Sequence, residues 1–463
     1  MTDPRPRDPD ADAGVDLTAL ARLAQDLVAA GLAAGATEAD AIAARSDALS
    51  VTIRDGALES AERADGIRVD LRVLVGGRQA IVSAADAGPA TLAEMAERAV
   101  AMAREAPVDD MLGLADPDQL ARDRDPAPLE LDDPAPGPDP LDLEGAALQA
   151  ESAARALSGI RQVEAASASF SRSGHWLCAS NEFSGGARHS MHALSVVAIT
   201  GEGTGMERDW ASEARIHGAD MPDPAEIGQL AAERTLARAG ARRPPTGAVP
   251  VLFDRRVSAS LIGHVLGAIN GRAIVRGASW LRDAMDMAIL PESMTLAELP
   301  HRPRHPASRL FDAEGLATQP RELIRDGVLT GWLLDLASAR KLGVAPTGHA
   351  ARGAGGPVAA SASNLRLSPG SATQAELIAQ MGRGLVVTGF LGASINATTG
   401  DYSRGVSGFW VEGGQIAYPV NECTIAGNLR EFLPRMIAAD DALPFRSTEV
   451  PSLLVEGLTV AGT

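Results

Sequence analysis

Apolar residues in the first quarter of the chain repeat at helical spacing and then at strand spacing. Residues 1–14 are polar and contain several prolines, which predicts a disordered tail. Asp16 then stands at the N-cap position of a predicted helix, whose apolar residues fall on one face: Leu17, Leu20, Leu23, Leu27 and Val28. Alternate residues are apolar over 67–75, which predicts a strand with one buried face. A second amphipathic helix is predicted over 89–105, so the first unit, residues 15–106, reads as helix, antiparallel sheet, helix.

Short glycine-containing pairs are expected to separate the strands. Asp55-Gly56, Asp65-Gly66 and Gly76-Gly77 lie between the apolar runs, and each pair favours the positive φ angles of a tight hairpin. The same chemistry recurs at Asp326-Gly327 and Gly413-Gly414. The strands are therefore expected to pair mainly antiparallel.

The rest of the chain divides by composition. Residues 107–142 are rich in proline and acidic residues, which predicts a semi-extended linker. A middle α+β segment follows over 143–221. Residues 222–463 begin with a predicted helix, strand and helix and continue with short strands, which indicates a β-rich C-terminal domain. The predicted fold class is α+β, with an N-terminal helix and antiparallel-sheet domain followed by this larger β-rich domain.

Composition narrows the classes of partner. The 463 residues are 45% hydrophobic and 22% charged, as in a soluble globular protein, and the net charge is -18. Nucleic acid is an unsuitable partner, because the chain contains no basic run. No signal peptide and no membrane-spanning segment is recognised, so we expect a cytoplasmic protein without membrane contact. Cys178 and Cys423 have no C-x-x-C neighbour, which predicts ordinary reduced thiols.

The common catalytic motifs are absent from the sequence. None of the eight histidines is followed by Glu, so H-E-x-x-H does not occur. Ser260 and His264 lie one helical turn apart on a predicted helix, which leaves a Ser–His hydrolase open as an alternative. The simpler interpretation is a small polar patch where this helix meets its neighbour.

The C-terminal region is similar to a known family. Residues 394–429 resemble the C-terminal signature of the TldD/PmbA family, and of its PmbA (TldE) branch in particular. Shorter similarities occur in the same order along the chain, at 76–79, 203–209, 244–254, 311–315, 331–343 and 363–365. The resemblance implies a two-part fold, and a heterodimer of a TldD-like and a PmbA-like chain around an enclosed chamber. It also implies a peptidase that cleaves small unfolded peptides, such as leader segments of modified peptide antibiotics and antitoxins.

The family's zinc motif is degenerate in this chain. The TldD-like subunit carries H-E-x-x-x-H and a late Cys as zinc ligands. Here His264 resembles the second His, whereas Ala259 and Ser260 occupy the first His and Glu positions, and the late Cys has no counterpart over 447–454. One imidazole cannot hold zinc, and without a carboxylate no base activates water. The resemblance therefore implies no catalytic or metal-binding residue and no cofactor in this chain, with zinc in a TldD-like partner.

The chain is then expected to supply chamber walls and to dock unfolded peptides. The candidate contact residues for peptide or partner are His264, Asn396, Thr399, Gly400, Asp401, Arg404 and Trp410. Residues 396–404 are predicted to form a tight polar turn, and a purely structural turn is the alternative. Two other functions remain open: an autonomous hydrolase, and a non-enzymatic peptide-binding scaffold. Whether the chain itself is an enzyme stays uncertain, and a homodimer is an alternative when the partner is missing.

Overall fold

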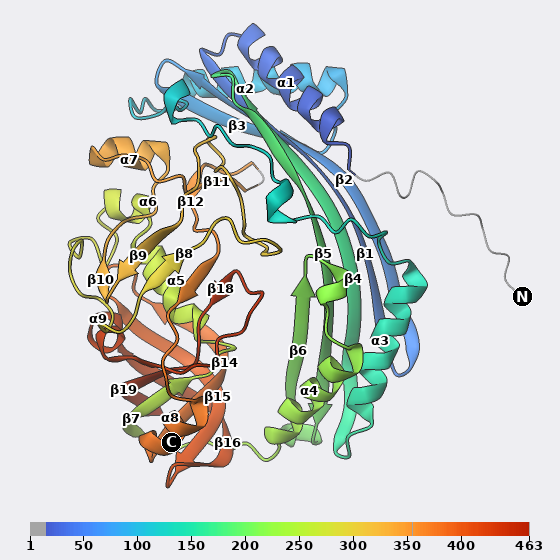
Figure 1. Cartoon of the computed structure of the whole chain (residues 1–463), viewed down its shortest axis with the longest axis vertical. Helices are drawn as coiled ribbons and strands as arrows, with labels where there is room; N and C mark the ends of the chain where they lie inside the picture. Colours follow the sequence, from blue (N-terminus) through green and yellow to red (C-terminus); the bar gives the residue numbers. More distant parts are fainter. Residues whose placement is uncertain (1–14, 354, 463) are drawn as a thin grey trace, which may run out of the picture.

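A long curved antiparallel sheet forms one side of the molecule, and the C-terminal half lies in its concave side (Figure 1). The computed structural model describes residues 15–353 and 355–462, so the predicted tail at 1–14 lies outside the described residues. The predicted α+β class is confirmed, with an N-terminal helix and sheet part and a larger β-rich C-terminal part. Within the described ranges no helix is both long enough and apolar enough to cross a membrane.

The large sheet has six strands in the order β3-β2-β1-β4-β5-β6, all paired antiparallel. Its strands are β1 (Glu38–Arg54), β2 (Ala57–Val75), β3 (Arg78–Ala84), β4 (Ile160–Ala179), β5 (Ser184–Thr200) and β6 (Glu207–Arg215). β1 pairs with β4 over fourteen residues, from Asp40 opposite Ala179 to Ile53 opposite Ala166. This pairing fuses the first unit and the middle segment into one continuous sheet.

Four helices cover one face of this sheet. They are α1 (Leu17–Ala33), α2 (Pro89–Glu105), α3 (Pro140–Arg155) and α4 (Pro224–Ala237). Odd-numbered β1 residues such as Ala41 and Val51 are buried beneath them, because alternate residues of a strand share a face. The even-numbered Asp40 and Ile42 face the other way, toward the C-terminal half.

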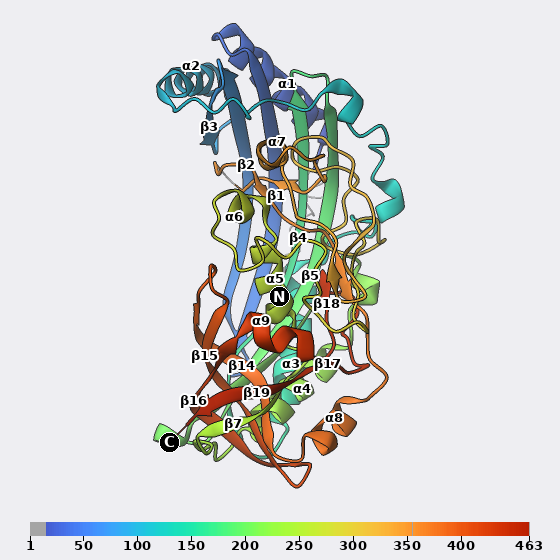
Figure 2. The ribbon, with the colours of Figure 1, turned by 90° about the vertical axis from the view of Figure 1, so that its left-hand side faces the viewer.

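The C-terminal half is built on a barrel-like sheet in the order β16-β15-β14-β7-β19, closed by pairing between β16 and β19. Its strands are β7 (Gly247–Phe253), β14 (Gly384–Ile395), β15 (Asp401–Glu412), β16 (Gln415–Asn428) and β19 (Leu453–Ala461), with β17 (Ile437–Ala438) at its side. A smaller sheet follows the order β10-β9-β8-β13-β18: Val328–Leu329, Arg321–Arg325, Leu296–Glu298, Leu365–Leu367 and Thr448–Glu449. Figure 2 shows the barrel strands near α3 and α4, toward one end of the large sheet.

Short elements complete this half. The helices are α5 (Ala259–Ala268), α6 (Gly271–Val275), α7 (Leu336–Leu342), α8 (Gln374–Met381) and α9 (Leu429–Phe432), and β11 (Ala350–Ala351) pairs with β12 (Ala359–Ala360). α5 packs into the main core of the half through Leu261, Ile262 and Val265, all fully buried.

Several predicted turns lie where expected, and one does not. The pairs Asp55-Gly56, Gly76-Gly77, Asp326-Gly327 and Gly413-Gly414 connect consecutive strands as hairpins. The prediction of a turn at Asp65-Gly66 is wrong: these residues lie inside β2, opposite Asp47 and Ser46 of β1. Continuous pairing with β1 determines the backbone there, so the local turn preference has no effect.

Two segments pack against parts of the molecule that the sequence does not predict for them. The acidic segment 107–142 is packed along the sheet, where Leu129 and Leu131 are buried and Leu131 accepts a hydrogen bond from Ser190 of β5. α4 packs beside α3 on the large sheet, although the sequence analysis places residues 222–237 with the C-terminal domain. The C-terminal half therefore starts structurally at β7.

A buried ion network holds the two halves together near β11. Arg72 of β2 donates to Asp40 of β1 at 2.6 Å from Nε and contacts Glu314 at 3.4 Å. Arg352, which follows β11, donates to the other oxygen of Asp40. The four side chains are only 1–4% exposed. We call Asp40, Arg72, Glu314 and Arg352 the sealed junction.

Candidate functional site

Helix α5 carries the positions that resemble the zinc motif. Its apolar residues face the core, whereas Gly263 and Gly267 on the opposite side are exposed. Ser260 and His264 are half-buried between these two faces. Just before the helix, the buried Ser258 donates from its hydroxyl to the carbonyl of Val450 at 3.3 Å, which ties the start of α5 to the segment before β19.

A polar cluster surrounds His264. Its ring meets the edge of Tyr402 with centroids 5.7 Å apart, and Arg404 of the same strand lies close enough to act on both side chains. The side-chain atoms Ser260 Oγ and His264 Nε2 are buried and have no hydrogen-bond partner among the described residues, and the buried Tyr402 hydroxyl has only Arg404 close enough to act on it. Unsatisfied buried polar atoms are unusual for a packed interior and are typical of a site that takes a ligand or water.

Electrostatics around His264 favour a neutral ring. Burial lowers the pKa of His264, and the positive charge of Arg404 lowers it further. Burial also raises the pKa of Tyr402, against the effect of Arg404, so its phenol stays protonated. No hydrogen bond links Ser260 Oγ to His264, so the described structure has no assembled Ser–His pair.

The donors at this cluster do not fit a zinc ion. Zinc needs three or four nitrogen, sulfur or carboxylate ligands, and the described residues contain no group of three or more such side chains placed to hold a metal. Cys423 is buried, donates to the carbonyl of Val406 at 3.5 Å, and burial raises the pKa of its thiol to about 11. The guanidinium of Arg404 would also repel a cation.

A tight polar turn connects β14 and β15 over residues 396–400, whereas Asp401 and Arg404 of the predicted turn already belong to β15. The side chain of Asn396 accepts from the backbone N–H groups of Thr398 and Thr399, and the Thr399 hydroxyl donates to Asp401 at 2.7 Å. Gly400 has φ +84°, a conformation that favours glycine. Asn396, Thr399 and Asp401 are exposed and Gly400 is buried. The predicted turn is present, and β15 places it next to Tyr402 and Arg404.

Trp410 lies apart from these residues. It is fully buried in the barrel core, and its indole donates to Glu412 at 3.0 Å. The structure leaves it no surface for a peptide or partner, so it is a core residue rather than a contact residue. Its neighbour Phe409 points to the opposite side of the strand, where it lines a pocket.

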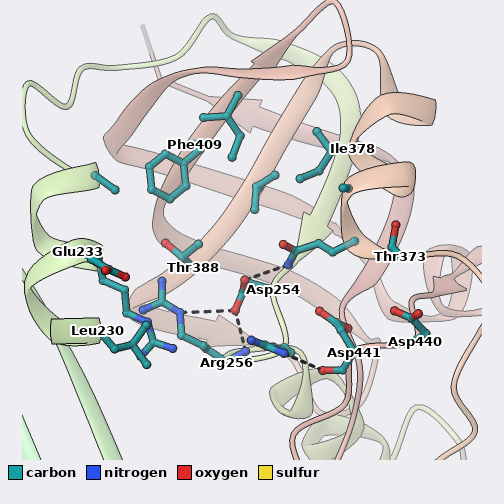
Figure 3. Close-up of a pocket in the computed structure, with 17 residues that line it drawn as sticks. Leu230, Glu233, Asp254, Arg256, Thr373, Ile378, Thr388, Phe409, Asp440 and Asp441 are labelled. Carbon is teal, nitrogen blue, oxygen red and sulfur yellow. Dashed lines mark hydrogen bonds and ion pairs between the residues drawn. The ribbon is translucent and has the colours of Figure 1, made fainter. Parts of the chain in front are cut away.

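That pocket is the feature that sequence reasoning missed. It has a volume of about 570 Å³ and lies between α4 of the large sheet and α8 with the barrel strands (Figure 3). Its lining residues fall in six separate stretches between Leu230 and Asp441, so no single motif marks it. The run Asp254-Arg255-Arg256 directly after the buried strand β7 is the one sequence signal that points to it. We call this pocket the open junction.

Comparison with known proteins decides the family. Three family models match in order: PmbA/TldA metallopeptidase domain 1 over 39–103, the central domain over 133–239 and the C-terminal domain over 246–462. The chain is also 35% identical to Metalloprotease PmbA of Escherichia coli O157:H7, over 93% of this chain and 94% of that protein. The chain belongs to the PmbA/TldD metallopeptidase family.

Other members and solved structures agree. A Metalloprotease PmbA homolog of Haemophilus influenzae is 34% identical over 89% of this chain and 90% of its own length. A Bacteroides thetaiotaomicron crystal structure, titled a putative modulator of DNA gyrase, superposes with TM-score 0.87 at 28% identity and covers 96% of this chain and 98% of its own. TldE from Thermococcus kodakarensis shares the fold, with TM-score 0.82 at 20% identity over 95% of this chain and the whole of that chain. The resemblance to the PmbA (TldE) branch is thereby confirmed.

Proposed function

We propose that this chain is the non-catalytic subunit of a cytoplasmic zinc metallopeptidase that cleaves small unfolded peptides. In this proposal a TldD-like partner supplies zinc, and this chain supplies chamber walls and peptide docking. The observation that carries the proposal is the cluster at His264, which keeps one imidazole of the motif and replaces its other donors by Ala259 and Ser260. Membership of a metallopeptidase family supports the peptidase part of it.

The chemistry of the cluster supports a docking role. A neutral His264, the Tyr402 hydroxyl and the Ser260 hydroxyl can each donate or accept one hydrogen bond, and Arg404 adds a fixed positive charge beside them. Such groups can form hydrogen bonds with the backbone carbonyls of a peptide without discriminating between its side chains. The exposed turn at Asn396, Thr399 and Asp401 lies next to this cluster and is the proposed contact with the partner or peptide.

Two other functions are weaker. An autonomous hydrolase would use Ser260 and His264, which no hydrogen bond joins in the described structure. A peptide-binding scaffold without any peptidase role would use the same polar cluster. Activity measurements separate the three functions.

The decisive experiment compares the purified chain with a mixture of this chain and a TldD-like chain that carries H-E-x-x-x-H. We expect no stoichiometric zinc and no cleavage of an unstructured peptide by the chain alone, and zinc-dependent cleavage after mixing. Exchanging the Glu of the partner's motif for Gln should abolish cleavage, whereas Ser260→Ala in this chain should not. Zinc-dependent turnover by the chain alone would overturn the proposal. Binding without cleavage in the mixture would favour the scaffold.

His264→Ala separates docking from catalysis. If His264 helps to dock peptides, the variant complex should keep its zinc content and its kcat and show a raised KM. If His264 holds a catalytic metal, zinc content and kcat should fall together.

A further inference from the structure

The open junction contains an arginine without a direct ion-pair partner in the described part of the chain. Arg234 of α4 lines the pocket and donates from Nη1 to the backbone carbonyl of Trp210 at 3.1 Å. Among the described residues no Asp or Glu lies within ion-pair distance of it. Burial and the nearby charge of Arg256 together lower the pKa of Arg234 to about 10, although the carboxylates of Asp209 and Asp254 oppose this shift. An anion in direct contact with this guanidinium would offset the repulsion from Arg256 and stabilise the charged form.

Four acidic residues line the pocket, and none of them forms an ion pair with Arg234 in the described structure; Glu233 of α4 accepts from Gln229 at 2.7 Å. Asp254 accepts from Gln374 at 3.0 Å and pairs with Arg256, and Asp441 accepts two hydrogen bonds from Ser452. Figure 3 shows Asp254 between these partners and Asp440 with Asp441 on the side away from α4. On the α4 wall, Arg234 therefore has no direct ion-pair partner within the described residues, although Asp209 and Asp254 lie near enough to affect its charge.

The opposite wall is apolar. Phe409 of β15 and Ile378 of α8 face the pocket (Figure 3). Two large apolar side chains at its sides are exposed, Leu230 at 38% and Ile416 at 53%. The hydroxyl of Thr388 also lines the pocket, and its oxygen is buried with no hydrogen-bond partner in the described structure. The pocket thus offers a cation, a free hydroxyl and apolar surface that is still exposed to water.

We propose that the open junction binds a carboxylate attached to a bulky apolar group, with the carboxylate on Arg234 and the apolar group against Phe409. Thr388 supplies a hydroxyl to a polar group of the same ligand. The volume of about 570 Å³ lies in the range of pockets that enclose small organic ligands. Two sources share this chemistry: the C-terminus of a peptide that ends in apolar residues, and a medium-chain carboxylic acid. This site is separate from the cluster at His264 and does not depend on the proposed function.

A ligand in this pocket would bridge the two halves of the molecule. It would contact α4, which is fixed to the large sheet, and β14, β15 and α8 of the C-terminal half. A ligand that contacts both halves stabilises their relative position by mass action.

Calorimetric titration of the full chain tests the proposal with three probes: N-acetyl-Leu-Leu, its C-terminal amide, and octanoate. We expect N-acetyl-Leu-Leu to bind at least about 10-fold more tightly than its amide, because a charge-assisted hydrogen bond is lost in the amide. Octanoate binding comparably to N-acetyl-Leu-Leu indicates a general carboxylate site, and a clear preference for N-acetyl-Leu-Leu indicates a peptide C-terminus.

Variants make the test specific. Arg234→Gln should weaken the binding of N-acetyl-Leu-Leu by about 10-fold or more and leave the binding of the amide unchanged, since only the carboxylate contacts the guanidinium. Thr388→Val is a second, milder variant and should weaken both dipeptides. Arg98→Gln, an exposed arginine on α2, is the matched control and should change nothing. Equal binding of acid and amide, an equal effect of Arg98→Gln, or no saturable binding of any probe at millimolar concentration would overturn the proposal.

Discussion

The sealed junction and the open junction connect the same two halves of the molecule but use arginine in opposite ways. At the sealed junction Arg72 and Arg352 meet Asp40 and Glu314, and water is almost completely excluded. At the open junction Arg234 forms no direct ion pair with any described carboxylate and lies beside a pocket of about 570 Å³. Paired buried arginines fix the relative position of the halves, whereas an unpaired arginine in a pocket can recognise an anion.

The largest effect is expected at Asp40. Asp40→Ala leaves the buried Arg72 and Arg352 without their shared carboxylate, which should lower the free energy of unfolding by about 3–5 kcal/mol. Urea denaturation measures this change. The matched control is Asp65→Ala, because Asp65 pairs with Arg45 on the same two strands with both side chains about half exposed, at 48% and 54%. It should cost no more than about 1 kcal/mol. Equal losses in the two variants would contradict the sealed-junction interpretation.

A pH dependence is expected from Glu314. Burial raises the pKa of Glu314 to about 7, against the attraction of Arg72, whereas its ordinary value is 4.5. Between these values the folded state holds more protons than the unfolded state, so stability should fall as pH rises from 4.5 to 7. Glu314→Gln removes this titration, and its free energy of unfolding should change less with pH over that window. Urea curves of both proteins across the window measure it, and parallel curves would refute the assignment.

Two threonines near the open junction should respond in opposite directions. Thr388→Val removes a buried hydroxyl without a partner and should stabilise the fold by up to about 1 kcal/mol in the absence of ligand. Thr235→Val removes a buried hydroxyl of α4 that donates to the carbonyl of Ala231 at 2.8 Å and accepts from Asp209. It should destabilise by about 1 kcal/mol. Thermal unfolding of both variants gives the sign, and a loss at both positions would show that the Thr388 hydroxyl has a partner.

The smallest effect on stability is expected at Arg234. Because Arg234 forms no ion pair in the described structure, Arg234→Gln should change the free energy of unfolding by no more than about 0.5 kcal/mol. Arg72→Gln, at the sealed junction, is the comparison and should cost several kcal/mol. The same denaturation experiment measures both. A large loss for Arg234→Gln would mean that this arginine supports the fold, and the contrast between the junctions would disappear.

Local chemistry predicted much of the fold. Gly76-Gly77 and Gly413-Gly414 lie in hairpins because no neighbouring strand overrides their preference for positive φ angles. Asp65-Gly66 is also a favourable turn pair but lies inside β2, where pairing with β1 continues through it. The turn at 396–400 was predictable because Asn396, Thr399 and Asp401 make their hydrogen bonds with each other and with adjacent backbone, although the prediction extended it to Arg404, which lies in β15.

The candidate site likewise has one part that could be predicted from the sequence and one part that could not. Helix α5 and its degenerate positions Ala259, Ser260 and His264 could be read from the sequence, because they follow one another on a single helix. The contact of His264 with Tyr402 and Arg404 could not be read, because β15 is more than a hundred residues away along the chain. The position of Trp410 in the core, rather than at a surface, also depends on how the barrel closes.

The sequence by itself determined the family, the α+β class, most hairpins and the absence of an H-E-x-x-H motif, since each depends on residue identity and on neighbours within a few positions. Only the tertiary structure decided that β1 and β4 join two units into one sheet, that α4 packs with α3, and that Arg234 lies unpaired beside a pocket. These features arise from contacts between segments far apart in the chain, and burial by such contacts determines which charges are paired and which are free to bind a ligand.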